Sequence, residues 1–197
     1  PHVKQAVVES LNSTAAHYTF PIGDAELRRE VAKRVKRVNG LDVDPDKNIT
    51  ISCGSDNLFA FVMRPFLTPG ENNEVMMPIP SYAHNFAVPP LIGGVCIEVP
   101  TYEEDGYDLR IEEFEKRVTP RTRIVIITTP NNPTATVYKR ETLERLADFV
   151  KRHNLIMVVD QAFEDTAFDG HEMVNIAALP GMQERTILLG SLSKGMA

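Results

Sequence analysis

The chain has 197 residues, of which 43% are hydrophobic, and a formal net charge of -6 at pH 7. This length is enough for one sizeable core and is short for two ordinary domains. No apolar run approaches the roughly 20 residues needed to cross a bilayer, and the basic residues are spread along the chain, so neither a membrane span nor a nucleic-acid surface is expected. We expect one soluble, cytoplasmic domain with small-molecule ligands.

The two cysteines give no sign of metal or disulfide chemistry. Cys53 and Cys96 each lie in an apolar, strand-like stretch. Such positions are typical of reduced, buried thiols. We therefore predict neither a disulfide nor a metal site. The amino-terminal residues also lack the charged and then apolar pattern of a secretory signal.

Short apolar runs alternate with longer segments of helical period along the whole chain. This alternation predicts an α/β fold with a mainly parallel sheet and crossover helices. Asp24 is placed to cap a first helix, which Gly40 ends. Strands are predicted at 49–53, 75–77, 95–99, 123–128, 155–159 and 186–189. Further helices are predicted at 56–66, 81–91, 111–118 and 139–153, the last with a buried stripe of Leu143, Leu146, Ala147 and Val150.

Ligands of open α/β sheets bind at the carboxyl ends of the strands, so the residues after each apolar run are the candidates for a site. Gly54, Ser55 and Asp56 follow the first run and open a helix. The free backbone N–H groups and the helix dipole there favour an anion such as phosphate. The alternative is an ordinary helix cap.

Two more strand ends carry groups that could contact a planar ligand. Tyr82 follows the run at 75–77, and its ring could lie flat against another ring or be an ordinary core or surface tyrosine. Asn131 and Asn132 follow the run at 124–127 in a loop stiffened by prolines. Such a loop either fixes an amide donor or is a simple proline turn.

The last two strand ends carry charged residues. Asp160 ends a buried strand, which is costly for an anion unless a cation or a protonated ring nitrogen offsets it; a helix cap or a salt bridge is the alternative. Lys194 follows the run at 186–189 in a turn of small residues. A desolvated lysine amine can form an imine with a carbonyl group, whereas most lysines near a chain end are merely solvated.

The order of these elements is more specific than any one of them. The series G-S-D-N, P-S-Y, T-P-N-N-P-T, V-V-D-Q-A-F and S-L-S-K resembles the fold type I, class I and II aminotransferases, which depend on pyridoxal 5'-phosphate (PLP). The segment from Tyr18 to Gly23, followed by Leu27 and Arg28, resembles the Y-x-x-x-x-G-x-x-x-L-R segment of that family. The resemblance spans nearly the whole chain.

The resemblance implies a role for each matching residue. Lys194 is the Schiff-base lysine, Asp160 pairs with the pyridine nitrogen, and Asn132 donates to the phenolic oxygen. Tyr82 stacks on the ring, and Tyr18 reaches the phosphate of a neighbouring subunit in a homodimer. The phosphate is surrounded by Gly54, Ser55, Asp56, Ser191 and Ser193. The implied reaction is transfer of an amino group from an amino acid to a 2-oxo acid.

Two departures from the family pattern stand out. Phe163 occupies the position where the family usually has tyrosine, so one hydroxyl donor to the cofactor's phenolic oxygen is missing. The chain also ends three residues after Lys194, whereas the family continues through a further strand, a phosphate-binding arginine and a small domain. We therefore expect residues 1–197 to be a PLP-binding large domain with an arm at 1–22, part of a longer protein, with unpaired sheet edges.

Three functional hypotheses follow. The first is transamination by the intact protein. The second is another PLP reaction on the same core, such as β-elimination or decarboxylation, because the cofactor breaks the bonds and the pocket chooses which one. The third is a PLP or amino-acid sensing module without catalysis. The sequence does not name the amino donor or acceptor, and His84 and Asn85 either line the pocket or lie on the helix surface.

Overall fold

The computed structural model describes residues 2–13 and 18–196. The helices are α1 (His2–Leu11), α2 (Ala25–Asn39), α3 (Ser55–Met63), α4 (Ala83–Leu91), α5 (Ile111–Glu115), α6 (Arg140–Arg152) and α7 (Leu192–Met196). The strands are β1 (Glu74–Ile79), β2 (Val95–Pro100), β3 (Thr122–Thr128), β4 (Ile156–Asp160) and β5 (Thr186–Leu189). Five short 3₁₀ turns lie at Arg64–Phe66, Glu103–Asp105, Glu164–Thr166, Ile176–Ala178 and Gln183–Arg185.

The chain divides into two compact units. One comprises Pro1–Val38 and Asp42–Ser52, and the other comprises Asn39–Leu41 and Cys53–Ala197. The second unit holds the whole sheet and helices α3 to α7. The arm predicted over residues 1–22 lies partly outside the described residues, and the assignment of 1–197 to one large domain stays a prediction.

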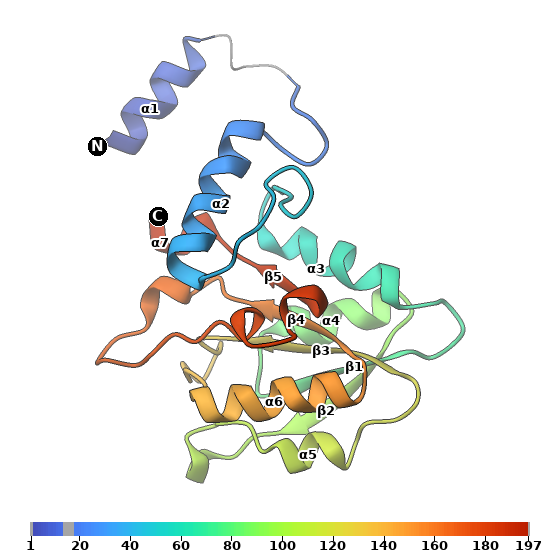
Figure 1. The fold of residues 1–197 in the computed structure, drawn as a ribbon. Coiled ribbons are helices and arrows are strands. Elements are labelled where there is room, and N and C mark those ends of the chain that lie inside the picture. Colours follow the sequence, from blue (N-terminus) through green and yellow to red (C-terminus); the bar gives the residue numbers. More distant parts are fainter. Residues whose placement is uncertain (1, 14–17, 197) are drawn as a thin grey trace. The chain divides into compact units, whose positions relative to one another are not determined.

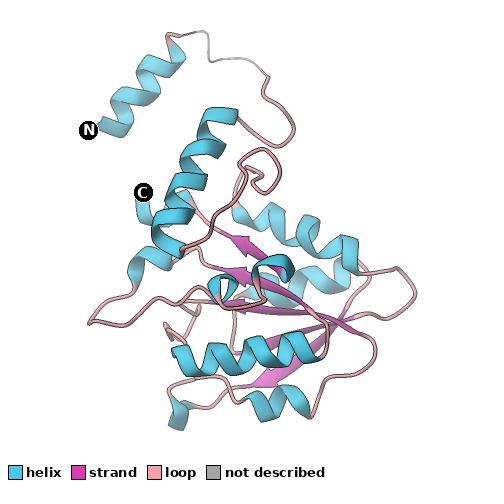
Figure 2. Cartoon of the chain, in the orientation of Figure 1, coloured by secondary structure: helices cyan, strands magenta, loops and turns pink. Residues whose placement is uncertain are grey.

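The sheet of the second unit is entirely parallel. Its five strands lie in the order β2-β1-β3-β4-β5, and every neighbouring pair is hydrogen-bonded in parallel register (Figures 1 and 2). A parallel sheet needs crossover connections, and the helices between the strands supply them. The predicted strands at 75–77, 95–99, 123–128, 155–159 and 186–189 are confirmed, with end points that differ by a few residues at most.

Two apolar layers cover the sheet, one on each face. Residues that alternate along the strands face opposite ways, so Val125 and Met157 pack with α5 and α6, whereas Ile124 and Val158 pack with α3 and α4. Figure 1 shows α5 and α6 together along one side of the strands. This is the predicted α/β architecture with helices on both faces, and it leaves only the strand ends free for a polar site.

The helices follow the signals that predicted them. The α6 stripe of Leu143, Leu146, Ala147 and Val150 is buried, as predicted. Helix α3 gives way to a 3₁₀ turn at Arg64, because Pro65 lacks the N–H that would continue the helix. Helix α4 begins at Ala83 rather than at residue 81, since Tyr82 still has an extended backbone.

The predicted strand at 49–53 is wrong. The structure assigns no strand to these residues, and the backbone N–H of Ile51 donates to the carbonyl of Ile22 at 2.9 Å within the first unit. The segment therefore bonds to a turn of its own unit and adds no strand to the sheet. Cys53, predicted to be a buried thiol, is exposed for the same reason, because it lies in the bend before α3 and not inside a strand. Cys96 is half-buried, and both thiols are free.

The first unit is organised around the capping and motif residues of α2. Asp24 accepts the backbone N–H of Leu27 at 2.9 Å, which confirms it as the cap, and Gly40 follows the helix with φ 72°. Arg28 is buried and donates to the carbonyl of Pro45 at 2.6 Å and to Asp46 at 2.7 Å. The Arg28 of the sequence motif is thus a structural anchor for the loop after α2.

Gly23 is expected to be far less tolerant of substitution than Gly40. A Cβ at Gly23 would lie 2.5 Å from the Cβ of Ile51 at φ +96°, whereas a Cβ at Gly40, with φ +72°, meets nothing within 4 Å. Gly23→Ala should lower the free energy of unfolding by about 3 kcal/mol, and Gly40→Ala by about 1 kcal/mol, because only the first adds a clash to the backbone strain. Urea unfolding of both variants measures the difference, and equal losses would contradict this account of the turn.

The surface and the sheet edges carry exposed apolar groups. Strand β5 bonds only β4 among the described strands, so the predicted unpaired edge is present.

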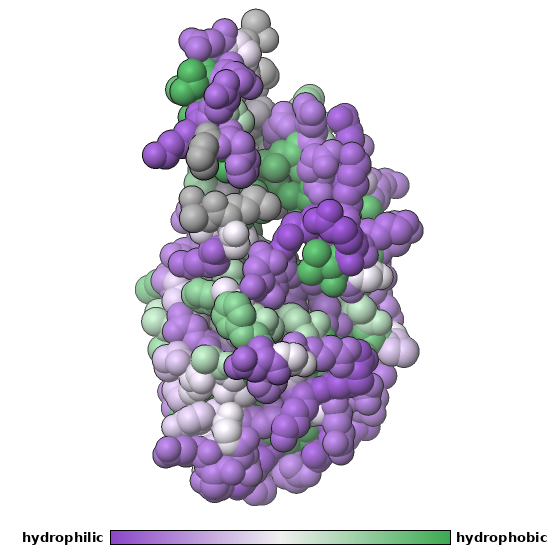
Figure 3. Space-filling model, turned by 90° about the vertical axis from the view of Figure 1, so that its left-hand side faces the viewer, coloured by the Kyte–Doolittle hydropathy of each residue, from purple (hydrophilic) through white to green (hydrophobic). Residues whose placement is uncertain are grey.

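Figure 3 shows a mainly hydrophilic face on which apolar groups are interspersed. The exposed large hydrophobic residues include Val7 and Leu11 of α1, Phe61 of α3 and Phe168. Among the described residues, no helix is both long and apolar enough to span a membrane.

Candidate active site

The strand order brings four of the predicted site residues to one edge of the sheet. Strands β1, β3, β4 and β5 are consecutive neighbours and all point the same way. The segments that leave their carboxyl ends carry Tyr82, Asn132, Asp160 and Lys194 respectively. Residues that lie far apart in the sequence therefore follow adjacent strand ends, as ligand-binding residues of open α/β sheets do.

Asp160 is the buried charge of this edge. It is the last residue of β4, pairs in register with Thr128 and Leu189, and is only 4% exposed. Burial raises the pKa of its carboxyl group to about 6, helped by the nearby charge of Asp56. The backbone N–H of Ala162, which donates to Oδ1 at 3.0 Å, and the charges of His84 and Lys194 act in the opposite direction on this pKa. These interactions only partly offset the cost of burying the carboxylate, so the group is suited to a cationic partner.

Tyr82 is tied to the start of α3. Its hydroxyl donates to Oδ1 of Asp56 at 2.9 Å, and its ring lies 5.9 Å from that of Phe59. Burial, together with the Asp56 carboxylate, raises the pKa of the Tyr82 phenol, so the hydroxyl keeps its proton. The tyrosine proposed to stack on a ring is therefore held in place through its hydroxyl.

The amino end of α3 carries the Gly-Ser-Asp sequence. Gly54 precedes the helix with φ 87° and ψ 150°, and no side chain caps the first turn at this position. A Cβ at Gly54 would meet nothing within 4 Å, so there is open space beside the backbone. Ser55 is half-buried and Asp56 is exposed. The arrangement leaves backbone donors of the first turn available to an anion.

The loop after β3 is fixed by Asn131, which the sequence motif places beside Asn132. Asn131 is 4% exposed, and its Nδ2 donates to the carbonyl of Pro80 at 3.1 Å and to Oγ1 of Thr134 at 2.7 Å. The first of these bonds joins the loop to the segment that carries Tyr82. Asn132 is half-buried, and its predicted role as a donor to a ligand stays a prediction.

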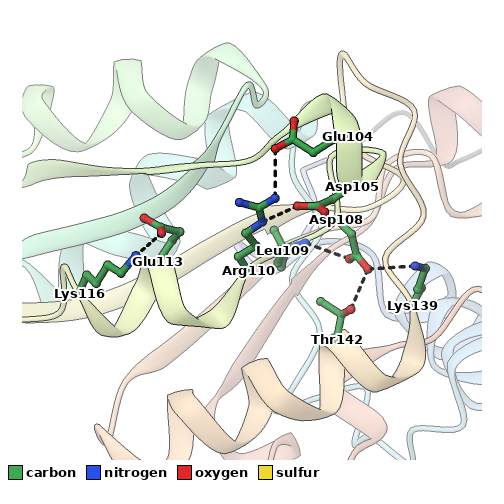
Figure 4. A network of polar contacts seen from close by, with 9 residues as sticks. All are labelled: Glu104, Asp105, Asp108, Leu109, Arg110, Glu113, Lys116, Lys139 and Thr142. Atoms are coloured by element: carbon green, nitrogen blue, oxygen red, sulfur yellow. Dashed lines mark hydrogen bonds and ion pairs between the residues drawn. The ribbon is translucent and has the colours of Figure 1, made fainter.

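The far end of this loop is anchored to the segment that follows β2. The Asp108 carboxylate accepts the hydroxyl of Thr142 at 2.8 Å and lies 3.9 Å from Nζ of Lys139 (Figure 4). The Thr136 hydroxyl donates to the carbonyl of Gly106 at 2.9 Å. Both ends of the loop are therefore held, which limits the freedom of Asn132.

Lys194 lies on α7, the short helix that follows β5. Its Nζ lies 5.4 Å from the centre of the Phe163 ring, at a distance where an ammonium interacts with an aromatic face. Ser191 is half-buried and Ser193 is exposed, and the Ser193 N–H donates to the Ser191 hydroxyl at 3.3 Å. The predicted lysine and serine residues thus occupy one turn.

One predicted site residue belongs to the other unit. Tyr18 is fully exposed in the first unit, so its proposed contact with the phosphate of a partner subunit stays a prediction. No cluster of three or more side chains able to hold a metal ion occurs within residues 2–13 and 18–196.

His84 and Asn85 were left undecided by the sequence. The His84 ring stacks on the Tyr82 ring, with the centroids 4.9 Å apart and the planes at 19°. Asn85 is fully buried and donates to the hydroxyls of Ser81, at 2.6 Å, and Thr128, at 3.2 Å. The surface alternative is therefore wrong for Asn85. The polar residue at the start of an otherwise apolar helix is the signal that could have indicated its burial.

Known proteins resemble the chain over its whole length. The family model for aminotransferase class I and II matches residues 1–197. Aromatic-amino-acid aminotransferase 2 of Thermococcus litoralis is 41% identical over 196 residues, and aspartate aminotransferase of Pyrococcus abyssi is 38% identical; each match covers 100% of this chain and 50% of the relative. The crystal structure of an aromatic aminotransferase from Pyrococcus horikoshii superposes with a TM-score of 0.95 at 39% identity, covering 98% of this chain and 51% of that one.

The chain belongs to the class I and II aminotransferase family. Its fold is that of the matching part of the solved aminotransferases. The chain spans about half the length of the curated relatives it matches.

Proposed function

We propose that, in the whole protein, this chain binds PLP through Lys194 and takes part in transfer of an amino group from an amino acid to a 2-oxo acid. The observation that carries the proposal is the buried Asp160 carboxylate, whose pKa is raised to about 6, at a strand end next to the one that leads to Lys194. Membership of the aminotransferase family supports the reaction type.

The donor set fits PLP. The carboxylate of Asp160 is buried away from water and lacks a strong opposite charge. A protonated ring nitrogen would supply that charge. The uncapped amino end of α3 at Gly54, with the hydroxyl of Ser55, suits a phosphate group, as do the hydroxyls of Ser191 and Ser193. Tyr82 offers an aromatic ring fixed through its hydroxyl. Carboxylate, anion cradle, aromatic ring and amine together match the parts of this one cofactor.

The protein residues orient the reaction and move protons. When bound, PLP supplies an electron sink for the bond that is broken at the substrate Cα. Asp160 would maintain the positive charge of the ring nitrogen, and Asn132 would donate to the phenolic oxygen. Nζ of Lys194, once the incoming substrate amine has released it, would move the proton from the substrate Cα to the carbon of the cofactor that receives the amino group. The Asn131 and Asp108 contacts hold the loop that carries Asn132, which reduces the cost of ordering it.

The assembly and location of the protein are part of the same proposal. We propose a homodimer in which Tyr18 of one subunit reaches the phosphate site of the other, and a cytoplasmic location. We propose that residues outside this chain hold the substrate carboxylate, a proposal that the half-length coverage of the relatives supports. The amino donor is therefore to be found by screening.

The assay that separates the functional hypotheses follows three products. The whole protein is incubated with PLP, a panel of amino acids and a 2-oxo acid, and the new amino acid, ammonia and carbon dioxide are measured. Formation of the new amino acid in step with loss of the donor is expected. Release of ammonia or carbon dioxide without amino transfer would favour another PLP reaction, and binding of PLP without any product would favour a sensing module.

Phe163→Tyr is expected to change the pH response of the bound cofactor. A hydroxyl at this position would donate to the phenolic oxygen and favour its deprotonated form, so the midpoint of the cofactor's absorbance change should fall by about 1 pH unit. Spectrophotometric pH titration of the whole protein measures the midpoint. Phe163→Leu is the matched control, since it also lacks the hydroxyl; an equal fall in both variants would contradict the assigned role.

A further inference from the structure

The unsatisfied polar atoms of the described chain gather near the candidate active site. Five buried side-chain atoms have no hydrogen-bond partner in the part of the chain that the structure describes. Four of them follow the carboxyl ends of β1, β3 and β4: His84 Nδ1, Asn85 Oδ1, Asn131 Oδ1 and Gln161 Nε2. Buried polar atoms without partners are uncommon in proteins, so each calls for an explanation. His84 is the only one of the four that can carry a charge.

His84 faces the Asp56 carboxylate. Its Nδ1 lies 4.0 Å from Oδ1 of Asp56, the same oxygen that accepts the Tyr82 hydroxyl at 2.9 Å. The imidazole lies against two aromatic rings, stacked on Tyr82 and 5.8 Å from the ring of Phe59. The buried Nδ1 is therefore within ion-pair distance of a carboxylate, without a hydrogen bond to it, and is shielded from water.

The Asp56 carboxylate stands in a place that is unfavourable for phosphate binding. Asp56 is the second residue of α3, whose amino end is the proposed phosphate cradle. A helix amino end favours one anion, but a carboxylate and a phosphate group near the same turn repel each other. The charges of Asp56 and His84 also act on Asp160: Asp56 raises the pKa of its carboxyl group and His84 lowers it, as expected if the three side chains lie near one another. A compensating donor beside Asp56 would remove the conflict.

We propose that His84 is a positioning residue that compensates the charge of Asp56 and so allows a phosphate group to bind at the amino end of α3. The inference rests on the proposed function, because it concerns the phosphate of the same cofactor. His84 can act through an Nδ1–H donor or as an imidazolium, and either form offsets the carboxylate. The Tyr82 hydroxyl supplies the second donor to the same oxygen.

A packing role for His84 is the competing explanation, and the variants separate the two. His84→Phe keeps an aromatic ring beside Tyr82 and removes the nitrogen that faces Asp56. Asp56→Asn keeps an oxygen that accepts the Tyr82 hydroxyl and removes the charge. If charge compensation is the function, the second substitution should correct the defect of the first.

The experiment measures cofactor affinity and not activity. Cofactor-free whole protein is titrated with PLP and, separately, with pyridoxal, which lacks the phosphate, and the dissociation constants are read from absorbance. His84→Phe should weaken PLP binding about fivefold, as expected for a partly exposed charge pair, and leave pyridoxal binding unchanged. The double variant His84→Phe/Asp56→Asn should bind PLP as the wild type does.

Each result has a definite meaning. Unchanged PLP affinity in His84→Phe, an equal loss for PLP and pyridoxal, or failure of Asp56→Asn to restore PLP binding would overturn the inference. A wild-type protein that does not bind PLP at all would instead overturn the proposed function. Circular dichroism and thermal unfolding of the cofactor-free variants identify any variant that has failed to fold. If His84→Phe fails to fold, His84→Ala and His84→Gln are compared in its place. His84→Gln keeps a hydrogen-bond donor, so it should bind PLP more tightly than His84→Ala does.

Discussion

Replacing Lys194 with arginine in the whole protein is expected to abolish covalent attachment of PLP and to lower transamination by at least about 10³-fold. Arginine keeps the positive charge near Phe163 but cannot form an imine, so the change removes the chemistry and retains the electrostatics. Loss of the absorbance of the protein-bound cofactor and initial-rate assays measure the two effects.

Lys151→Arg is the matched control for this substitution. Lys151 is in the last turn of α6, which leads to the start of β4, whereas the candidate site follows the carboxyl ends of the strands; it pairs with Asp148 at 3.0 Å. Its replacement should leave both cofactor attachment and activity unchanged. Wild-type activity in Lys194→Arg, or an equal loss in Lys151→Arg, would contradict the assignment of Lys194.

Asp160→Asn is expected to lower the activity of the whole protein by roughly 10²–10⁴-fold while leaving the fold intact. Asparagine fits the same space but cannot maintain the positive charge of a ring nitrogen, so the electron sink is lost. The exposed Asp148→Asn is the control and should have no effect. Activity of Asp160→Asn within a few-fold of wild type would exclude the proposed role.

The same substitution should make the cofactor-free protein more stable at neutral and alkaline pH. The pKa of Asp160 is raised from 3.8 to about 6 by burial, so the folded state holds an ionised carboxylate at a cost above pH 6. The cost is on the order of 2–3 kcal/mol and disappears as the pH falls from about 6 toward 4, because the folded protein then binds the proton. Urea unfolding should therefore show a stabilisation by Asp160→Asn at pH 8 that shrinks toward pH 4. A constant difference across this range would contradict the raised pKa.

The sequence was sufficient for the parts of the fold that depend on local patterns. The continuously apolar runs at 123–128 and 155–159 became the central strands β3 and β4, because only buried parallel strands suit such runs. The stripe on α6 and the Asp24 cap were confirmed for the same reason: hydrophobic periodicity and capping are encoded within a few residues. The strand ends that carry Asp160 and Lys194 followed from these boundaries.

Features that depend on contacts between distant segments were not predictable in this way. Residues 49–53 have the composition of a strand, but Ile51 bonds to Ile22 in the first unit. No local signal distinguishes pairing with a strand of the sheet from this bond to Ile22. The grouping of Asp56, Tyr82 and His84 likewise depends on how α3 and α4 pack on the sheet. Sequence spacing of 26 residues between Asp56 and Tyr82 gives no indication of a hydrogen bond.

The raised pKa of Asp160 depends both on a local strand pattern and on contacts that only the structure shows. The strand pattern predicted burial of a carboxylate, and the structure adds that its only described hydrogen bond comes from the backbone of Ala162. A buried anion with so few partners is destabilising by itself, which supports the proposal that a cation binds beside it. The stability cost and the proposed function are therefore two consequences of one residue.

Borohydride reduction of the PLP-loaded whole protein, followed by peptide mapping, tests the central claim most directly. Reduction fixes the cofactor to the amine that holds it, so the account predicts a pyridoxyl group on the peptide that contains Lys194 and on no other. Recovery of the label on a different lysine, or no label from protein that has bound PLP, would contradict the account.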